Sequence, residues 1–256
     1  MPPAGDRQKR SCILNWQLAY CLCRLAMVED SLGESERAAR ARRIAKQVAA
    51  AADALFWDNH RGLWADDPEH TSFSEHAQAL ALLSDLAPAD HAARAGRGLL
   101  EDPNLVRTTI YFSHYLFEAC QRLGAIDHLI KRMDLWFGLA AQGFSTTPEE
   151  PEPSRSDCHA WGAHPLYHYR TSILGIRPAA PGFRRVRIEP QLGPLQWASG
   201  SICHPRGLIS AEFRRAGDGL HWRIELPDGI SGELIRDGHS IALHPGQNDG
   251  PVRSGG

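Results

Sequence analysis

The chain has 256 residues, of which 43% are hydrophobic and 23% are charged, a balance typical of a globular protein with a packed core. Its length is sufficient for one large domain or two ordinary ones. The formal net charge is -2, so the chain has no excess of the basic residues on which nucleic-acid binding depends. No stretch of the sequence is long and apolar enough to cross a bilayer. We therefore expect neither a nucleic acid nor a membrane as a partner.

A first helix is predicted near the N-terminus. Three basic residues precede a fairly apolar run over residues 13–27, which superficially suggests a secretory signal. Polar residues interrupt that run, however, and no small-residue cleavage site follows it. Helical spacing instead predicts a packed helix that buries Leu14, Leu18, Cys21, Leu22 and Leu25. The six cysteines have no framework spacing, which favours mostly buried thiols and, together with the absence of a signal, a cytoplasmic location.

Helical spacing of apolar residues continues to about residue 137. A second helix is predicted over residues 35–55 and a third over residues 74–86, and shorter ones follow Pro88 and Pro103. A last helix is expected from His159 to Leu174. The apolar stripe of the second helix consists of Ala41, Ile44, Val48, Ala51 and Leu55. Consecutive helices with short links are antiparallel hairpins by default.

From Val186 the apolar period changes from helical spacing to two. Residues 209–213 and 220–226 alternate between apolar and polar, which predicts strands, and glycine-containing turns follow at 216–219 and 237–238. We therefore predict a mainly α chain followed by a small antiparallel β-sandwich. The expected division is a helical domain over residues 1–177, a β domain over 178–246 and a flexible tail over 247–256.

The stretch from Gly143 to Ile188 links the two parts and is rich in side chains that can carry chemistry. Its prolines lack an amide donor and restrict the preceding residue, which rules out a helix before about Cys158. The stretch delivers Glu149 and then the run Cys158-His159-Ala160-Trp161. A loop stiffened by proline in this way is typical of a polar site presented on a scaffold.

This stretch closely resembles the bacterial α-L-rhamnosidases, which are inverting glycosidases built on a six-hairpin α/α toroid. The resemblance rests on residues 146–153 and 155–165, followed by Leu174 to Pro178 and by Gly182 to Pro190 at the start of the β part. Weaker similarities upstream lie at residues 11–17, 56–63, 73–80 and 110–118. The pattern predicts about seven helices, fewer than the twelve of a complete toroid. The resemblance therefore implies the C-terminal half of the catalytic toroid with its β appendage.

The resemblance assigns the role of catalytic base to Glu149. Inverting hydrolysis requires one carboxylic acid to protonate the leaving oxygen and one carboxylate to activate water. Glu150 and Glu152 are the alternatives if the alignment shifts, and a solvated acidic surface is the structural alternative. Arg155 could pair with Asp157 or Glu149 and tune the base, or could brace the turn.

The residues expected to bind the sugar are His159 and Trp161, which share one side of an extended segment. Trp161 offers a flat apolar face to a sugar ring, and His159 offers a hydrogen-bond donor to a hydroxyl; the resemblance implies that His159 contacts the sugar at the point of cleavage. Further candidates for substrate binding are Glu75 and His76 at a helix start, where the resemblance implies inner-ring residues that face the cleft, and Tyr111 and Trp136 as aromatic walls. Core packing is the alternative for each of these residues.

Metal and nucleophile chemistry are disfavoured by the spacing of the remaining candidates. Four residues are of types that bind zinc, but their spacing is not the paired spacing of a zinc site. They are Cys158, His159, His164 and His168. Cys158 and His159 are adjacent, which seldom places a nucleophile and its base face to face. We expect no metal and no other cofactor.

The general acid of the family lies in an acidic motif that no part of residues 1–100 matches. Without that acid, the base alone should give little turnover. The sequence is interpreted as an α-L-rhamnosidase-like glycoside hydrolase fragment that acts on rhamnose-containing glycosides. Its uncovered apolar faces predict self-association or a chain that supplies the other half of the toroid. The alternatives are a non-catalytic carbohydrate-binding or partner-packing remnant of a toroid, and another six-hairpin glycosidase.

Overall fold

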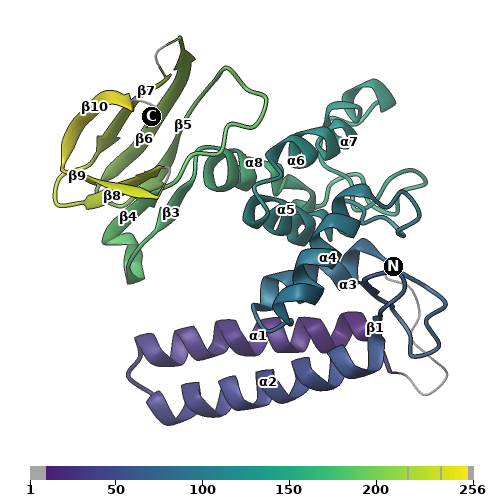
Figure 1. Ribbon diagram of the computed structural model, residues 1–256. Helices are drawn as coiled ribbons and strands as arrows, with labels where there is room; N and C mark the ends of the chain where they lie inside the picture. The colour runs from purple at the N-terminus through teal and green to yellow at the C-terminus, as the bar shows by residue number, and fades with distance from the viewer. Residues whose placement is uncertain (1–9, 218, 237, 253–256) are drawn as a thin grey trace. The chain divides into compact units, whose positions relative to one another are not determined.

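The computed structural model describes residues 10–217, 219–236 and 238–252. The chain divides into two compact units: unit 1 comprises the residues up to 119 together with 148–157, and unit 2 comprises 120–147 and the residues from 158 onward. The two four-stranded sheets follow the helices along the chain, as predicted, but a short hairpin at residues 57–64 interrupts the helical part (Figure 1). The predicted domain boundary after residue 177 falls inside unit 2, within strand β3 (Ile176–Pro178).

Unit 1 begins with two long helices that lie side by side, α1 (Cys12–Ser31) and α2 (Ser35–Phe56) (Figure 1). The Oγ of Ser11 caps α1 by accepting a hydrogen bond from the backbone N of Leu14 at 3.4 Å. The face of α2 that is buried consists of Ala38, Ala41, Ala45, Ala49, Ala52 and Phe56. Ala41 is buried as predicted, but each later buried residue follows a predicted one by a single position. Alanines are buried here because they let two helix backbones approach more closely than Ile44 or Val48 would.

The face that α1 buries is not the predicted one. Its buried residues are Cys12, Ile13, Trp16, Ala19 and Ala26. Leu14, Leu18, Cys21 and Leu25 are exposed, so the prediction that they pack in the core is wrong. Apolar residues occur on both sides of this helix, and the choice between the two sides is made by packing against α2 and by Trp16, whose ring centroid lies 5.3 Å from that of Trp64.

The rest of unit 1 is built around a fully buried helix. A short hairpin of β1 (Trp57–Asp58) and β2 (Leu63–Trp64) precedes α3 (Glu75–Ser84) and α4 (Ala89–Glu101). All ten residues of α3 are buried. Gln78 on α3 binds the backbone of Trp64 twice: its Oε1 accepts from the Trp64 N at 3.0 Å, and its Nε2 donates to the Trp64 O at 2.7 Å. Helix α5 (Ser113–Arg122) contains the boundary after residue 119.

The helical part of unit 2 is made of short elements. They are α6 (Ile126–Arg132), α7 (Asp134–Phe137), 3₁₀ turns at Ala140–Gln142 and Ala160–Ala163, α8 (Pro165–His168) and a π-helical turn at Tyr169–Ile173. The single helix predicted from His159 to Leu174 is therefore divided into three pieces. Pro165 opens a new helix at its first turn, because its ring and missing N–H do not fit a helix interior.

Two four-stranded sheets complete unit 2. One has the order β3-β4-β8-β9, with β4 (Arg185–Ile188), β8 (Ser231–Arg236) and β9 (His239–Leu243), and its β4–β8 pair is parallel. The other has the antiparallel order β10-β7-β6-β5, with β5 (Trp197–His204), β6 (Gly207–Ala216), β7 (Gly219–Leu226) and β10 (Gly246–Val252). Alternate residues along β6 and β7 are buried, as the period of two predicts.

Strand β10 occupies residues for which the sequence predicts a flexible tail. It pairs with β7 throughout residues 246–252, and Gly250 lies opposite Trp222. A Cβ at position 250 would lie 3.3 Å from the Trp222 indole, so glycine lets the strand approach the ring closely. Backbone pairing needs no particular side chains, which is why a Gly- and Asn-containing segment of low β propensity can form an edge strand. The last four residues of the predicted tail lie outside the described part of the chain.

The described helices include none with the length and hydropathy needed to cross a bilayer. Two of the six cysteines, Cys12 and Cys120, are buried, and burial raises the pKa of the Cys12 thiol. Cys21, Cys158 and Cys203 are exposed. The expectation that most of the thiols are buried is therefore wrong.

Candidate active site

The proline-rich loop is held by hydrogen bonds to backbone groups of residues close to its two ends. In unit 2, the His159 N donates to the Thr147 O at 2.7 Å, and the Thr147 Oγ1 donates to the His159 O at 2.9 Å. In unit 1, the Glu149 N donates to the Ser156 O at 2.8 Å. These bonds satisfy backbone groups that a helix or sheet would otherwise satisfy. The loop is thus an ordered element, as its prolines predict.

Glu149 is the shielded carboxylate of this loop. Its side chain is 10% exposed, whereas that of Glu150 is 40% exposed. The Nη2 of Arg155 donates a hydrogen bond to the Oε1 of Glu149, and the Nε of Arg155 lies 3.6 Å from the Oε1 of Glu150. The predicted pairing of Arg155 with Glu149 is therefore present. Glu149 is thus less exposed than Glu150, and its role as the base stays a prediction.

His159 and Trp161 form an aromatic pair in unit 2. Their ring centroids are 4.0 Å apart and their planes are inclined by 36°. Trp161 is 41% exposed, so part of its ring is accessible. The Nδ1 of His159 is buried and has no hydrogen-bond partner within the part of the chain that the structure describes. A buried polar atom without a partner is costly, so this imidazole is held in place by the packing of the turn around it.

Trp136 supports the turn that carries this pair. Its Nε1 donates to the Gly162 O at 2.7 Å, and its ring meets His164 edge-on at 5.1 Å. Gly162 lies in the 3₁₀ turn next to Trp161. Trp136 thus holds the backbone beside Trp161, and its predicted contact with substrate stays a prediction.

The predicted site residues of unit 1 outside the loop have contacts of their own. Glu75 is 4% exposed, and its Oε2 accepts hydrogen bonds from the N and the Oγ1 of Thr108 at 2.7 and 2.9 Å. Tyr111 is 43% exposed and meets the rings of Phe112 and Tyr115 edge-on. Burial and the neighbouring Tyr111 hydroxyl raise the pKa of Tyr115. The role of Glu75 and Tyr111 in substrate binding stays a prediction.

His76, the neighbour of Glu75 at the helix start, is a titratable group whose pKa is shifted by burial. It is 5% exposed, and burial lowers its pKa to about 4. Its ring lies 4.4 Å from that of Phe112, and its Nδ1 has no hydrogen-bond partner among the described residues. Its burial against Phe112 agrees with the packing alternative, and its contact with substrate stays a prediction.

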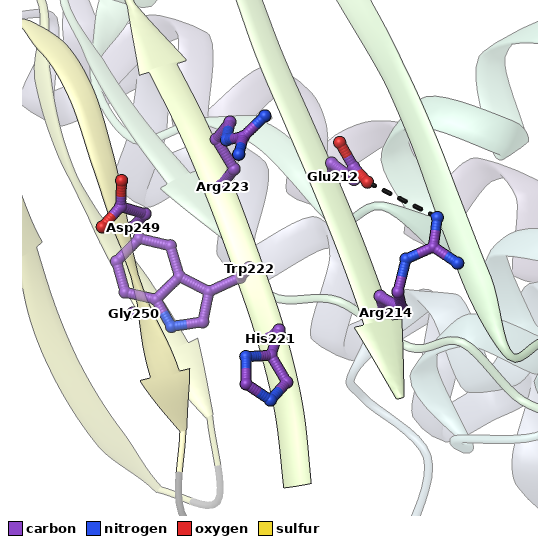
Figure 2. Close-up of a pocket in the computed structure, with 7 residues that line it drawn as sticks. All are labelled: Glu212, Arg214, His221, Trp222, Arg223, Asp249 and Gly250. Carbon is purple, nitrogen blue, oxygen red and sulfur yellow. Dashed lines mark ion pairs between the residues drawn. The ribbon is translucent and has the colours of Figure 1, made fainter. Parts of the chain in front are cut away.

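A hollow of about 350 Å³ lies on the sheet formed by β10, β7, β6 and β5 (Figure 2). Its lining residues are Glu212, Arg214, His221, Trp222, Arg223, Asp249 and Gly250. The charges neutralise one another: Arg214 pairs with Glu212 at 3.7 Å, and strand register places Arg223 between Glu212 and Asp249. Trp222 is only 8% exposed. This hollow offers a sugar less aromatic surface than Trp161 does.

Comparisons with known proteins point to the family that the loop resembles. Residues 175–241 match the model of the bacterial alpha-L-rhamnosidase C-terminal domain. An alpha-L-rhamnosidase of Alteromonas sp. (strain LOR) is 28% identical over 246 residues, which cover 87% of this chain and 26% of that protein. The resemblance to α-L-rhamnosidases is confirmed.

Solved structures of α-L-rhamnosidases extend this similarity to the fold. The GH78 family rhamnosidase of Bacillus sp. GL1 has a TM-score of 0.77 and 25% identity, covering 88% of this chain and 26% of that chain. The Streptomyces avermitilis alpha-L-rhamnosidase, solved in complex with L-rhamnose, has a TM-score of 0.72 and 18% identity. That match covers 92% of this chain and 26% of the Streptomyces chain. The chain thus spans about a quarter of the length of these relatives.

Proposed function

We propose that this chain is part of an α-L-rhamnosidase-type glycoside hydrolase that removes terminal α-L-rhamnosyl residues with inversion. The sequence similarity to an alpha-L-rhamnosidase over 87% of the chain supports this class of reaction. On this proposal the helices are one part of a six-hairpin α/α toroid, and the two sheets form a β-sandwich appendage. The substrate is a rhamnose-containing glycoside, and the cytoplasmic location and the absence of a cofactor stay predictions.

Glu149 is the base in this proposal, and its shielding beside Arg155 is the observation that carries the assignment. The carboxylate accepts a proton from water, and the water oxygen attacks the anomeric carbon from the face opposite the aglycone. The bond from the anomeric carbon to the aglycone oxygen then breaks, and that oxygen takes a proton from a general acid. Arg155 offsets the charge of a carboxylate that has little contact with water.

His159 and Trp161 bind the sugar in this proposal. The exposed part of the Trp161 ring covers one apolar face of the pyranose, and the imidazole of His159 donates a hydrogen bond to a hydroxyl. Trp136 holds the adjoining turn in place. Glu75 and Tyr111 are further proposed contacts of the sugar. The carboxylate of Glu75 already accepts a hydrogen bond from Thr108, which leaves it less free to bind a ligand.

The proposed site contains a base but no identified acid. Residues 1–100 lack the acidic motif of the family, and the acid must come from another residue or another chain. Proton donation to the leaving group typically contributes 10²–10⁴-fold to the rate. We therefore expect the purified chain to hydrolyse an aryl α-L-rhamnoside barely above background. Because this activity is expected to be so low, non-catalytic carbohydrate binding is the second candidate function.

Sugar binding is tested by calorimetric titration of the chain with L-rhamnose and, for comparison, D-mannose. We expect L-rhamnose to bind more tightly, with Trp161→Ala weakening binding about tenfold and His159→Ala about 2–10-fold. The control is Trp197→Ala on β5, since Trp197 is also exposed, at 54%, and should leave binding unchanged. Equal loss in the control, or L-rhamnose binding that neither site variant affects, would remove this pair from the site.

A further inference from the structure

One histidine of unit 1 joins the loop of residues 66–73 to the end of helix α2. The loop leads from β2 to α3, and His70 lies at its middle. The Nδ1 of His70 lies 3.1 Å from the Oδ2 of Asp58 on β1, and its Nε2 lies 3.2 Å from the Leu55 O in the last turn of α2. The imidazole therefore bridges the loop to two elements that precede it in the chain. We call this contact the His70 bridge.

Both partners of the imidazole are hydrogen-bond acceptors. A backbone carbonyl can only accept, and the Asp58 carboxylate is ionised because its pKa is lowered, chiefly by the hydrogen bond from the Arg61 N and further by His70. A neutral imidazole has one N–H and donates to one of the two acceptors, whereas an imidazolium has two N–H groups. The doubly protonated form of His70 is therefore the form that makes both hydrogen bonds.

The other charged groups near the bridge are bound elsewhere or exposed. The guanidinium of Arg61 donates to Asp102 at 2.5 Å. The carboxylate of Asp67 accepts hydrogen bonds from residues of its own loop, and the side chains of Glu69 and His60 are exposed. Among the described residues, the ion pair of the bridging imidazole is the one on β1.

The backbone at His70 agrees with a side chain that is held by its contacts. Its φ is 55°, in the left-handed region that residues other than glycine seldom adopt. A sparsely populated conformation of this kind persists where the surrounding structure fixes it. The His70 N donates to the Asp67 O at 3.1 Å, which closes the turn that carries the imidazole.

The loop beyond His70 leads directly to the start of α3. The Oγ atoms of Ser72 and Ser74 donate to the Asp66 carboxylate at 2.9 and 2.6 Å. Ser74 is also the N-cap of α3, since its Oγ accepts from the Ala77 N at 3.5 Å. The segment that the bridge fastens is therefore the one that sets the first turn of this buried helix.

We propose that the His70 bridge is a pH-sensitive fastening of the loop of residues 66–73. At low pH the imidazolium donates to both Asp58 and Leu55, and the loop is closed onto the end of α2. As the pH rises, loss of one ring proton leaves one acceptor without its donor and removes the ion pair, so the loop opens more often. This inference rests on the geometry of unit 1 and is independent of the proposed function.

His91 on α4 shows why two acceptors matter. Its Nδ1 lies 2.9 Å from the Oδ1 of Asp53, and its Nε2 lies 3.8 Å from the Oδ2 of Asp90, which is beyond hydrogen-bond distance. A neutral ring with its proton on Nδ1 keeps this single hydrogen bond. Loss of a proton therefore changes the contacts of His91 less than those of His70.

Amide hydrogen exchange of the loop at pH 5.5 and pH 8.5, corrected for the intrinsic pH dependence of exchange, tests the proposal. Histidine changes its charge between these values, whereas burial lowers the pKa of His76 to about 4 and keeps it neutral at both. Because the side chains of His70 and Asp58 are only 28% and 22% exposed, protection of residues 66–73 should be about 3–10-fold lower at pH 8.5.

In His70→Asn the protection of the loop should be low at both pH values. Asparagine tolerates the left-handed backbone, so added strain is not the cause. The matched control is His60→Asn, which removes an exposed histidine from the turn between β1 and β2 and should keep the pH dependence of the native chain. Circular dichroism melts check that both variants fold. An equal change with pH in His70→Asn overturns the proposal, as does a native loop whose protection is the same at both pH values.

Nitrogen nuclear magnetic resonance of the imidazole needs no variant. At pH 5.5 the ring of His70 should show two N–H protons that exchange slowly with water, because each is held by an acceptor. At pH 8.5 one of them should be lost. Fast exchange of both protons at pH 5.5 would show that the bridge is not made, and would overturn the proposal.

Discussion

At the scale of single residues, burial decides what each titratable group does. His76 is 5% exposed and its pKa is lowered to about 4 by burial, below the usual value of 6.5. It is therefore neutral at pH 7 in the folded chain. Between pH 6.5 and pH 4 the unfolded chain binds a proton that the folded chain does not bind. The free energy of unfolding should fall as the pH is lowered through this window, by up to about 3 kcal/mol.

Urea unfolding of the native chain and of His76→Gln between pH 7 and pH 4 measures this effect. Glutamine keeps a polar side chain of similar size but does not titrate, so the variant should lose less stability over the same window. The difference between the two pH profiles isolates His76 from the other histidines. Parallel profiles would show that His76 does not stay neutral in the folded chain.

The residues of the proposed site differ in how far the sequence predicts them. Glu149 and Arg155 lie six residues apart in one loop, and their pairing could be predicted from proximity in the sequence. The shielding of Glu149 could not, because it depends on how the loop folds. The burial of Glu75 was equally inaccessible, since its partner Thr108 lies 33 residues away. Sequence motifs thus indicate residue types, whereas long-range packing decides their exposure.

At the scale of elements, buried side-chain hydrogen bonds fasten the hairpin of unit 1 to its central helix. Gln78 is fully buried and satisfies both the N and the O of Trp64. Gln78→Leu would leave these two backbone groups without partners, and we expect a loss of about 2–4 kcal/mol in the free energy of unfolding. Gln142→Leu is the control, because Gln142 is exposed and its bond to the Gly138 O lies at the surface. Equal losses in thermal or urea unfolding would contradict this account.

Element type was predicted better than element packing. The period of 3.6 identified the helices and the period of two identified β6 and β7. Periodicity did not identify the buried face of α1, which has apolar residues on both sides, and packing of small alanines decided it. Strand β10 was missed because its pairing with β7 depends on backbone hydrogen bonds and on Gly250 beneath Trp222, neither of which a hydropathy pattern contains.

At the scale of the whole molecule, the helical part precedes the two four-stranded sheets in the order that the sequence predicts. The similarity to α-L-rhamnosidases covers most of this chain but about a quarter of the relatives' length. The resemblance could be read from the loop because its uncommon residues keep their order and spacing. The completeness of the catalytic centre could not be read in the same way, because inversion requires two carboxyl groups that come from distant parts of a chain.

The measurement that tests the central claim most directly is the hydrolysis of α-L-rhamnosyl fluoride, followed by proton nuclear magnetic resonance. Fluoride leaves without protonation, so a site that has the base but no acid should hydrolyse this substrate much faster than an aryl α-L-rhamnoside. The first product should be β-L-rhamnose. Glu149→Gln should lower the rate by about 10²–10⁴-fold, whereas Glu150→Gln should leave it nearly unchanged. Hydrolysis that gives α-L-rhamnose first, or that proceeds equally well in Glu149→Gln, would contradict the assignment of Glu149 as the base of an inverting rhamnosidase site.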